Sequence, residues 1–202
     1  MIYDFNQTCN TYDAYIYNKD HFKATPCPKC PGVGRFTMHG CYSRYVIYFT
    51  NDEKIICEQK KIKRIYCTSC KSTHAVMPGD IIPYKILSLI VFIHILVSFY
   101  LEKVPVQEVA KKLDFSVQFI YSVMRAFQKH LNNVRQYIKE TYPEDVPAVF
   151  DVSGVLSYIK GRAIDFQAGY IEKNRKACFM CKMFNKTGAP PAWKIIPYLE
   201  TT

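Results

Sequence analysis

Two pairs of cysteines constrain the fold of this chain more than any other feature of its sequence. Cys27 and Cys30 stand in CPKC, and Cys67 and Cys70 stand in CTSC. A CxxC turn presents two thiolates from one tight loop, so two such turns supply four sulfur ligands and close a tetrahedral shell without an open position. We therefore predict one structural Zn²⁺ held by these four cysteines. The alternative is four reduced, buried thiols.

The segment between the two turns predicts a β-hairpin. Residues 42–49 and 55–66 are rich in aromatic and β-branched side chains, and Asn51 and Asp52 predict the turn between them. A hairpin between two cysteine turns is the arrangement of a zinc ribbon, which we place at residues 25–84. Three further residues could ligate a metal, although two complete CxxC turns leave them unnecessary: His39, Cys41 and His74.

A third CxxC pair, Cys178 and Cys181 in CFMC, has no partner pair of its own. In this apolar setting we expect two free thiols. One alternative is a second metal site that is completed by Cys9 or Cys57, or by another subunit. The other alternative is a redox-active pair.

Composition favours a cytoplasmic protein with a polyanionic partner. Residues 1–10 contain Asp4 and lack the basic cluster and apolar core of a signal peptide. The net charge of +10 favours nucleic acid or an anionic membrane surface. The longest apolar run, residues 86–101, is about 16 residues long and includes Ser88 and His94, whereas a bilayer core needs about 20. It predicts a buried helix, with a membrane span as the alternative.

Residues 106–125 fit the pattern of a helix-turn-helix. Small or apolar side chains occupy the buried positions of that pattern: Val109, Ala110, Leu113, Ile120 and Val123. Asp114 stands at the turn, where Gly is usual because φ is positive, and Ser116 is a natural N-cap for the second helix. The alternative is an ordinary helical hairpin with a solvated outer face.

The outer face of the second helix predicts contacts to double-stranded DNA. Gln118 can bond base edges there, whereas the other exposed polar side chains suit phosphates. The predicted DNA-binding set on this helix is Ser116, Gln118, Tyr121, Ser122 and Arg125, with Val117 beside them. A basic strip on the hairpin would contact the phosphate backbone or else protect a strand edge: Lys60, Lys61, Lys63 and Arg64.

These elements predict an α+β chain in four parts. Residues 1–24 form an N-terminal extension, residues 25–84 the zinc ribbon, and residues 85–142 a helical domain that contains the helix-turn-helix. Residues 143–202 form a short mixed C-terminal segment. Within it, residues 148–150 have the character of a strand that ends at Asp151.

Several segments of the chain resemble those of a known family: CPKC, HGCYSR, IKRIYCTSCKSTHAVMPGDIIPY and the helix-turn-helix that follows them. The stretch of residues 25–135 is similar to the N-terminal region of insertion-sequence transposases with a zinc ribbon, and more closely to the DUF6431 family of short transposase-like proteins. Cys41 stands where a Tyr is common in such families. The resemblance implies binding of element-end DNA by an insertion-element accessory or regulatory protein. A homodimer is compatible with that role, and no small-molecule substrate is expected.

Three alternatives to this function remain. A DDE-type transposase or nuclease would need three carboxylates to hold two metal ions, and the candidates are Asp151, Asp165 and Glu172. Only 51 residues follow Asp151, which we take as too few for the rest of such a sheet, so we expect no catalytic domain. The second alternative is a membrane-associated zinc protein anchored by residues 86–101. The third is binding of RNA or single strands, because the chain has 16 tyrosines on which bases could stack.

Overall fold

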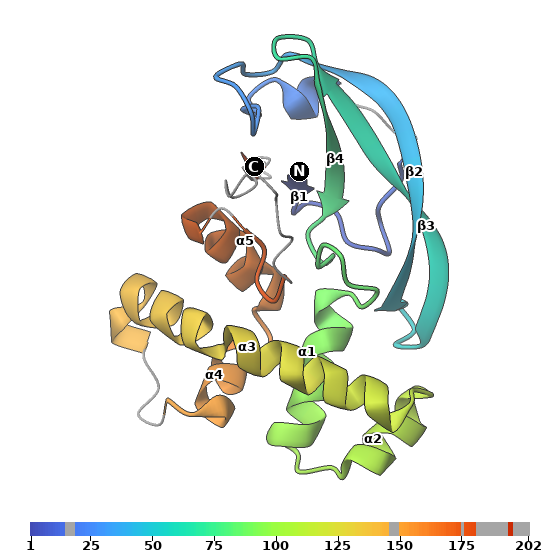
Figure 1. Cartoon of the computed structure of the whole chain (residues 1–202), viewed down its shortest axis with the longest axis vertical. Helices are drawn as coiled ribbons and strands as arrows, with labels where there is room; N and C mark the ends of the chain where they lie inside the picture. Colours follow the sequence, from blue (N-terminus) through green and yellow to red (C-terminus); the bar gives the residue numbers. More distant parts are fainter. Residues whose placement is uncertain (15–18, 146–149, 175, 181–193, 196–202) are drawn as a thin grey trace. The chain divides into compact units, whose positions relative to one another are not determined.

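The chain divides into two units, and the first contains a mixed β-sheet (Figure 1). The computed structural model describes residues 1–14, 19–145, 150–174, 176–180 and 194–195. Residues 1–88 and 167–202 belong to the first unit, and residues 89–166 to the second. The division into four parts that the sequence suggests stays a prediction.

The sheet has the strand order β2-β3-β4-β1-β5. Its antiparallel part consists of β2 (Phe36–Phe49), β3 (Ile55–Cys67) and β4 (Ser72–Pro78). Strand β1 (Ile2–Asp4) runs parallel to β4, and β5 (Lys194–Ile195) runs parallel to β1. The N-terminal residues therefore contribute a strand to the sheet, which their sequence did not reveal.

Strands β2 and β3 form the predicted hairpin, seen as a long curved ribbon in Figure 1. Their aromatic and β-branched residues favour the extended conformation. The turn between them is closed by the Thr50 amide, which donates to the Lys54 carbonyl at 2.8 Å. A β-bulge between Met38 and Gly40 shifts the register near the other end of the hairpin.

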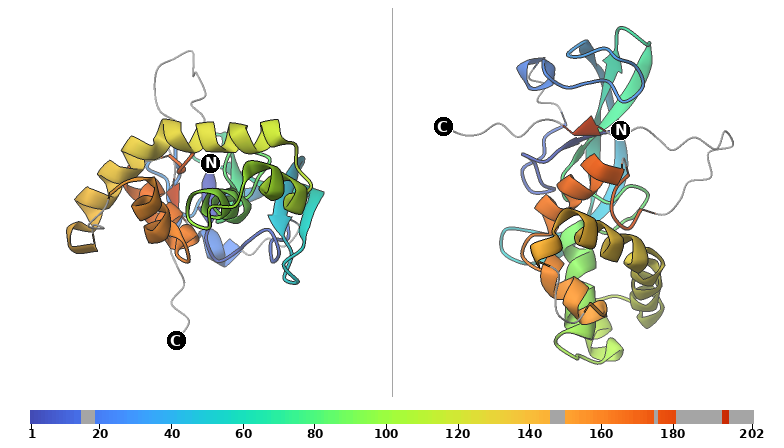
Figure 2. Two further views of the ribbon diagram at one scale, coloured as in Figure 1. Left: turned by 90° about the horizontal axis from the view of Figure 1, so that it is seen from below. Right: turned by 90° about the vertical axis from the view of Figure 1, so that its left-hand side faces the viewer.

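The second unit is helical. It contains α1 (Leu89–Tyr100), α2 (Val106–Leu113), α3 (Val117–Thr141), the short 3₁₀ helix η2 (Pro143–Asp145) and α4 (Val152–Ile159). The long helix α3 contacts α1, α2 and α4 (Figures 1 and 2). Helix α5 (Ala163–Asn174) contains the boundary between the units.

The predicted apolar helix at residues 86–101 is α1, which is shorter than that run. Among the described helices, none combines the length and the apolar character that crossing a membrane requires. Eight of the 12 residues of α1 are buried. The interpretation of this run as a buried helix therefore agrees with the structure.

Candidate metal centre and the exposed face of helix α3

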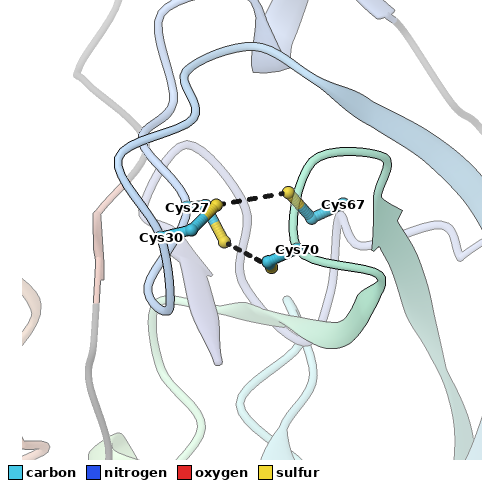
Figure 3. Close-up of side chains that lie close together, drawn as sticks. All are labelled: Cys27, Cys30, Cys67 and Cys70. Carbon is cyan, nitrogen blue, oxygen red and sulfur yellow. Dashed lines mark hydrogen bonds between the residues drawn. The ribbon is translucent and has the colours of Figure 1, made fainter.

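Four cysteines from two separate turns converge at one end of the sheet (Figure 3). Their sulfur atoms all lie within 4.8 Å of one another. The Sγ atoms of Cys27 and Cys70 are 3.6 Å apart, and those of Cys30 and Cys67 are 3.8 Å apart. Four thiolates at such distances can surround a single ion, as the two CxxC turns predict.

The first cysteine turn is held by its own backbone. The Cys27 amide donates to the Gly32 carbonyl at 2.8 Å, and the Gly34 amide donates to the Thr25 carbonyl at 3.0 Å. Gly34 has a φ of 64°, and a Cβ there would lie 2.3 Å from the Lys23 carbonyl oxygen. Glycine is therefore required at this position by both conformation and space.

The second turn joins β3 to β4. The Lys71 amide donates to the Cys67 carbonyl at 2.9 Å, and Lys71 itself adopts a left-handed φ of 58°. The Thr68 amide bonds the Arg35 carbonyl at 2.9 Å, which ties this turn to the residue before β2. The strand pairing thereby brings two turns together that are far apart in sequence.

An apolar cluster surrounds the cysteines and keeps water away from one side of them. Cys27 and Cys67 are themselves buried in that cluster, and Cys30 and Cys70 pack against it. The other members are Ile2, Phe22, Phe36, Ile65 and Val76. Burial raises the pKa of the Cys27 thiol to about 12. At Cys70 burial is outweighed by hydrogen bonds with Ser72 and Cys27, which lower the pKa of that thiol to about 6. A bound divalent metal would stabilise the thiolate form of all four cysteines.

His74 on β4 contacts the cysteine cluster from outside. Its Nε2 atom lies 3.3 Å from the Cys27 Sγ atom, and its ring meets that of Phe36 edge to face. Burial lowers the pKa of His74 to about 4, which keeps the imidazole neutral at neutral pH. A neutral ring with its proton on Nε2 can donate to the Cys27 thiolate, so His74 fits an outer partner of the site. The sequence marks His74 as a possible substitute ligand, and the structure places it beside Cys27.

The other candidate ligands lie outside the cluster. His39 is exposed and stacks on Tyr66, with ring centroids 5.8 Å apart, and Cys41 Sγ donates to the Ala14 carbonyl. Cys178 is fully buried and Cys181 lies outside the described residues. In the described part of the chain, no metal-ligating group includes Cys178. Cys9 is buried and Cys57 is exposed.

The three candidate carboxylates lie on helices or at the start of one. Asp151 caps α4, and its carboxylate accepts the Gly154 amide at 2.8 Å. Asp165 and Glu172 lie on α5. Of residues 148–150, the structure describes only Phe150, which belongs to no strand, so Asp151 begins a helix and does not end a strand. Among the described residues, the three carboxylates form no metal-ligating cluster.

The junction between α2 and α3 has the local geometry that its sequence predicts. Asp114 ends α2 in the left-handed conformation, with φ 55° and ψ 42°. Ser116 caps α3 by accepting the Phe119 amide at 3.2 Å. The five side chains expected to be buried at this junction are all buried: Val109, Ala110, Leu113, Ile120 and Val123.

The first half of α3 exposes the polar face expected from its sequence. Gln118, Ser122 and Arg125 are exposed, and the Tyr121 side chain is 46% exposed. A hollow of about 410 Å³ lies along this face. Its lining residues all belong to α3: Gln118, Tyr121, Met124, Arg125 and Gln128.

The predicted basic strip on β3 is not continuous. Lys61 and Arg64 are exposed, but Lys60 pairs with Glu58 at 2.5 Å and lies over the Tyr48 ring. Lys63 is only 7% exposed, and its ammonium lies 5.7 Å from the centre of the Tyr12 ring. Burial lowers the pKa of Lys63. Lys63 is therefore buried beside Tyr12, whereas the contact of this strip with phosphate stays a prediction.

A family model matches part of the chain. Residues 27–112 match the model described as a domain of unknown function (DUF6431), a stretch that begins at Cys27, includes all four clustered cysteines and ends within α2. No curated protein and no solved structure matches the chain. Over residues 27–112, somewhat less than half of its length, the chain is similar to the DUF6431 family.

Proposed function

We propose that this chain is a DNA-binding protein of the transposase-related type, in which a structural Zn²⁺ stabilises the sheet unit and α3 reads double-stranded DNA. The observation that carries the proposal is the polar face of α3. This helix follows a left-handed turn at Asp114, and Ser116 caps its first turn. Helix-turn-helix proteins insert the N-terminal half of such a second helix into the major groove.

The side chains on this face match the chemistry of a duplex. Gln118 offers an amide that can form two hydrogen bonds with adenine, and Arg125 offers donors for phosphate or for guanine. Tyr121 and Ser122 supply hydroxyl groups. Residues 106–141 carry six Lys and Arg against three Asp and Glu, a balance that favours a polyanion.

The four-cysteine cluster supports zinc as the metal. An all-thiolate set favours Zn²⁺ over Mg²⁺ or Ca²⁺, which prefer oxygen ligands. Four protein ligands leave no position for a substrate, so the ion would hold the two turns together and would not catalyse a reaction. The absence of an assembled carboxylate site in the described residues gives the enzyme alternative no support.

The test is binding of zinc-loaded protein to duplex DNA from the flanks of its own gene, measured at several salt concentrations against a scrambled duplex. We expect preferential binding that weakens with salt. The double variant Gln118→Ala with Arg125→Ala removes that preference. A matched control, Gln136→Ala with Lys139→Ala, removes one exposed amide and one exposed cation near the C-terminal end of the same helix. We expect this variant to keep the preference for the duplex from the gene's flanks. Equal loss in both variants, or no duplex binding by the wild type, would sink the proposal.

A further inference from the structure

An open hollow in the sheet unit gathers exposed aromatic side chains and cations. Its volume is about 380 Å³, within the range of roughly 300–1,000 Å³ that is usual for ligand sites. The residues that matter here are Tyr42, Arg44, Tyr45, Tyr84, Lys85 and Ile86. All of them belong to residues 1–88, so the hollow lies within one unit.

Large apolar side chains are unusually exposed at this hollow. Tyr45 is 58% exposed, Tyr84 is 51% exposed and Ile86 is 40% exposed. Tyr84 also has a left-handed backbone with a φ of 62°, a conformation that tyrosine rarely adopts. Backbone outliers of this kind cluster at active sites, ligand clamps and switch regions.

The wall that carries Tyr84 is fixed to the sheet. The Ile47 amide on β2 donates to the Ile86 carbonyl at 2.7 Å, and the Ser88 amide donates to the Ile47 carbonyl at 2.8 Å. The guanidinium of Arg44 on β2 donates to the Lys85 carbonyl. The two sides of the hollow are therefore held together by hydrogen bonds before any ligand arrives.

The charge at the hollow selects an anion. Two of its lining residues are cations, and no Asp or Glu lines it. Within the described residues, neither Arg44 nor Lys85 forms an ion pair with a carboxylate. A ligand that combines a flat ring with a negative charge can use both the tyrosines and the cations of the hollow, because rings stack on tyrosine and phosphates pair with cations.

We infer that this hollow binds single-stranded nucleic acid, with an unpaired base stacked on Tyr84 and Tyr45 and the neighbouring phosphate beside Lys85 and Arg44. No residue of α3 lines the hollow, so the site does not depend on duplex recognition by that helix. It gives the sheet unit a binding activity of its own, independent of base sequence, because every base has a face that can stack.

The experiment measures fluorescence anisotropy of a labelled oligothymidylate of about 15 nucleotides, a length on the scale of known single-strand sites. Tyr84→Asn removes the ring and tolerates the left-handed backbone, and Tyr84→Phe keeps the ring. We expect Tyr84→Asn to weaken binding roughly 5- to 150-fold, the equivalent of one lost stacking contact. Tyr84→Phe retains nearly all of the affinity. Ile90→Ala, which removes an exposed apolar side chain outside the hollow, leaves single-strand binding unchanged.

Three results would overturn the inference. The first is a wild-type protein that binds duplex but no oligothymidylate, an outcome that leaves the proposed function of α3 intact. The second is wild-type affinity in Tyr84→Asn, with an unchanged melting curve. The third is a dimer, detected by light scattering, that Tyr84→Asn dissociates, because a second copy would then cover the hollow. Binding of oligothymidylate without binding of duplex DNA would support this site and contradict the proposed function of α3.

Discussion

At the scale of single residues, we expect only the four clustered cysteines, out of nine in the chain, to bind the metal. Changing Cys30 to Ser should reduce zinc retention against a competing chelator by about an order of magnitude or more, because the ion loses one of four ligands. The matched control is Cys57→Ser, which alters an exposed thiol outside the cluster and should keep one ion per chain. Mass spectrometry measures the zinc content of both variants. Equal zinc loss in the two would contradict the assignment of these four cysteines as the ligands.

His74 gives a second prediction at this scale. His74→Phe removes the contact to Cys27 Sγ but keeps an aromatic ring against Phe36. Loss of an outer partner of this kind costs about 10- to 100-fold in metal affinity. His39→Phe is the control, since His39 stacks on Tyr66 away from the sulfur atoms. Competition titrations with a chromophoric chelator measure the zinc affinity of both variants. An unchanged affinity in His74→Phe would contradict the role of His74 as an outer partner of the metal site.

At the scale of elements, the turn between α2 and α3 can be tested by backbone preference alone. Asp114 is exposed and left-handed, with a φ of 55°. Glycine adopts this conformation without penalty, whereas alanine does not. We expect Asp114→Gly to be more stable than Asp114→Ala by about 1 kcal/mol. Urea unfolding followed by circular dichroism measures the difference, and the reverse order would contradict the turn geometry.

Local patterns in the sequence predict local structure well in this chain. The two CxxC turns, the hairpin around Asn51, the left-handed Asp114 and the Ser116 cap all follow from neighbouring residues. Each depends on turn chemistry or on the periodicity of side chains within one segment.

Long-range pairing is what the sequence did not reveal. Ile2 pairs with Val76, and Tyr12 covers Lys63, although more than 50 residues separate each pair of partners. Neither a three-residue strand nor a buried lysine leaves a pattern in its own neighbourhood. The contact of His74 with Cys27 is likewise long-range, because 47 residues separate the two.

At the scale of the whole molecule, metal binding should depend on pH. The raised pKa of Cys27 means that the metal-free thiol is protonated at neutral pH, so the incoming ion must displace that proton. Zinc affinity therefore rises with pH and falls as pH is lowered. Burial is outweighed at Cys70 by hydrogen bonds with Ser72 and Cys27, which lower its pKa to about 6, so we expect up to about three protons released per ion at neutral pH. Calorimetry in buffers of different ionisation enthalpy counts the protons. Binding without proton release would contradict the burial of the thiols.

The central claim is that α3 is the surface that meets duplex DNA. Photocross-linking of zinc-loaded protein to a duplex that carries 5-iododeoxyuridine, mapped by mass spectrometry, tests it most directly. The exposed aromatic ring of Tyr121 is the expected cross-linked residue, with Gln118 and Arg125 on the same face. A cross-link at Tyr121 that Arg125→Ala suppresses agrees with this account. Cross-links confined to the sheet unit would contradict it.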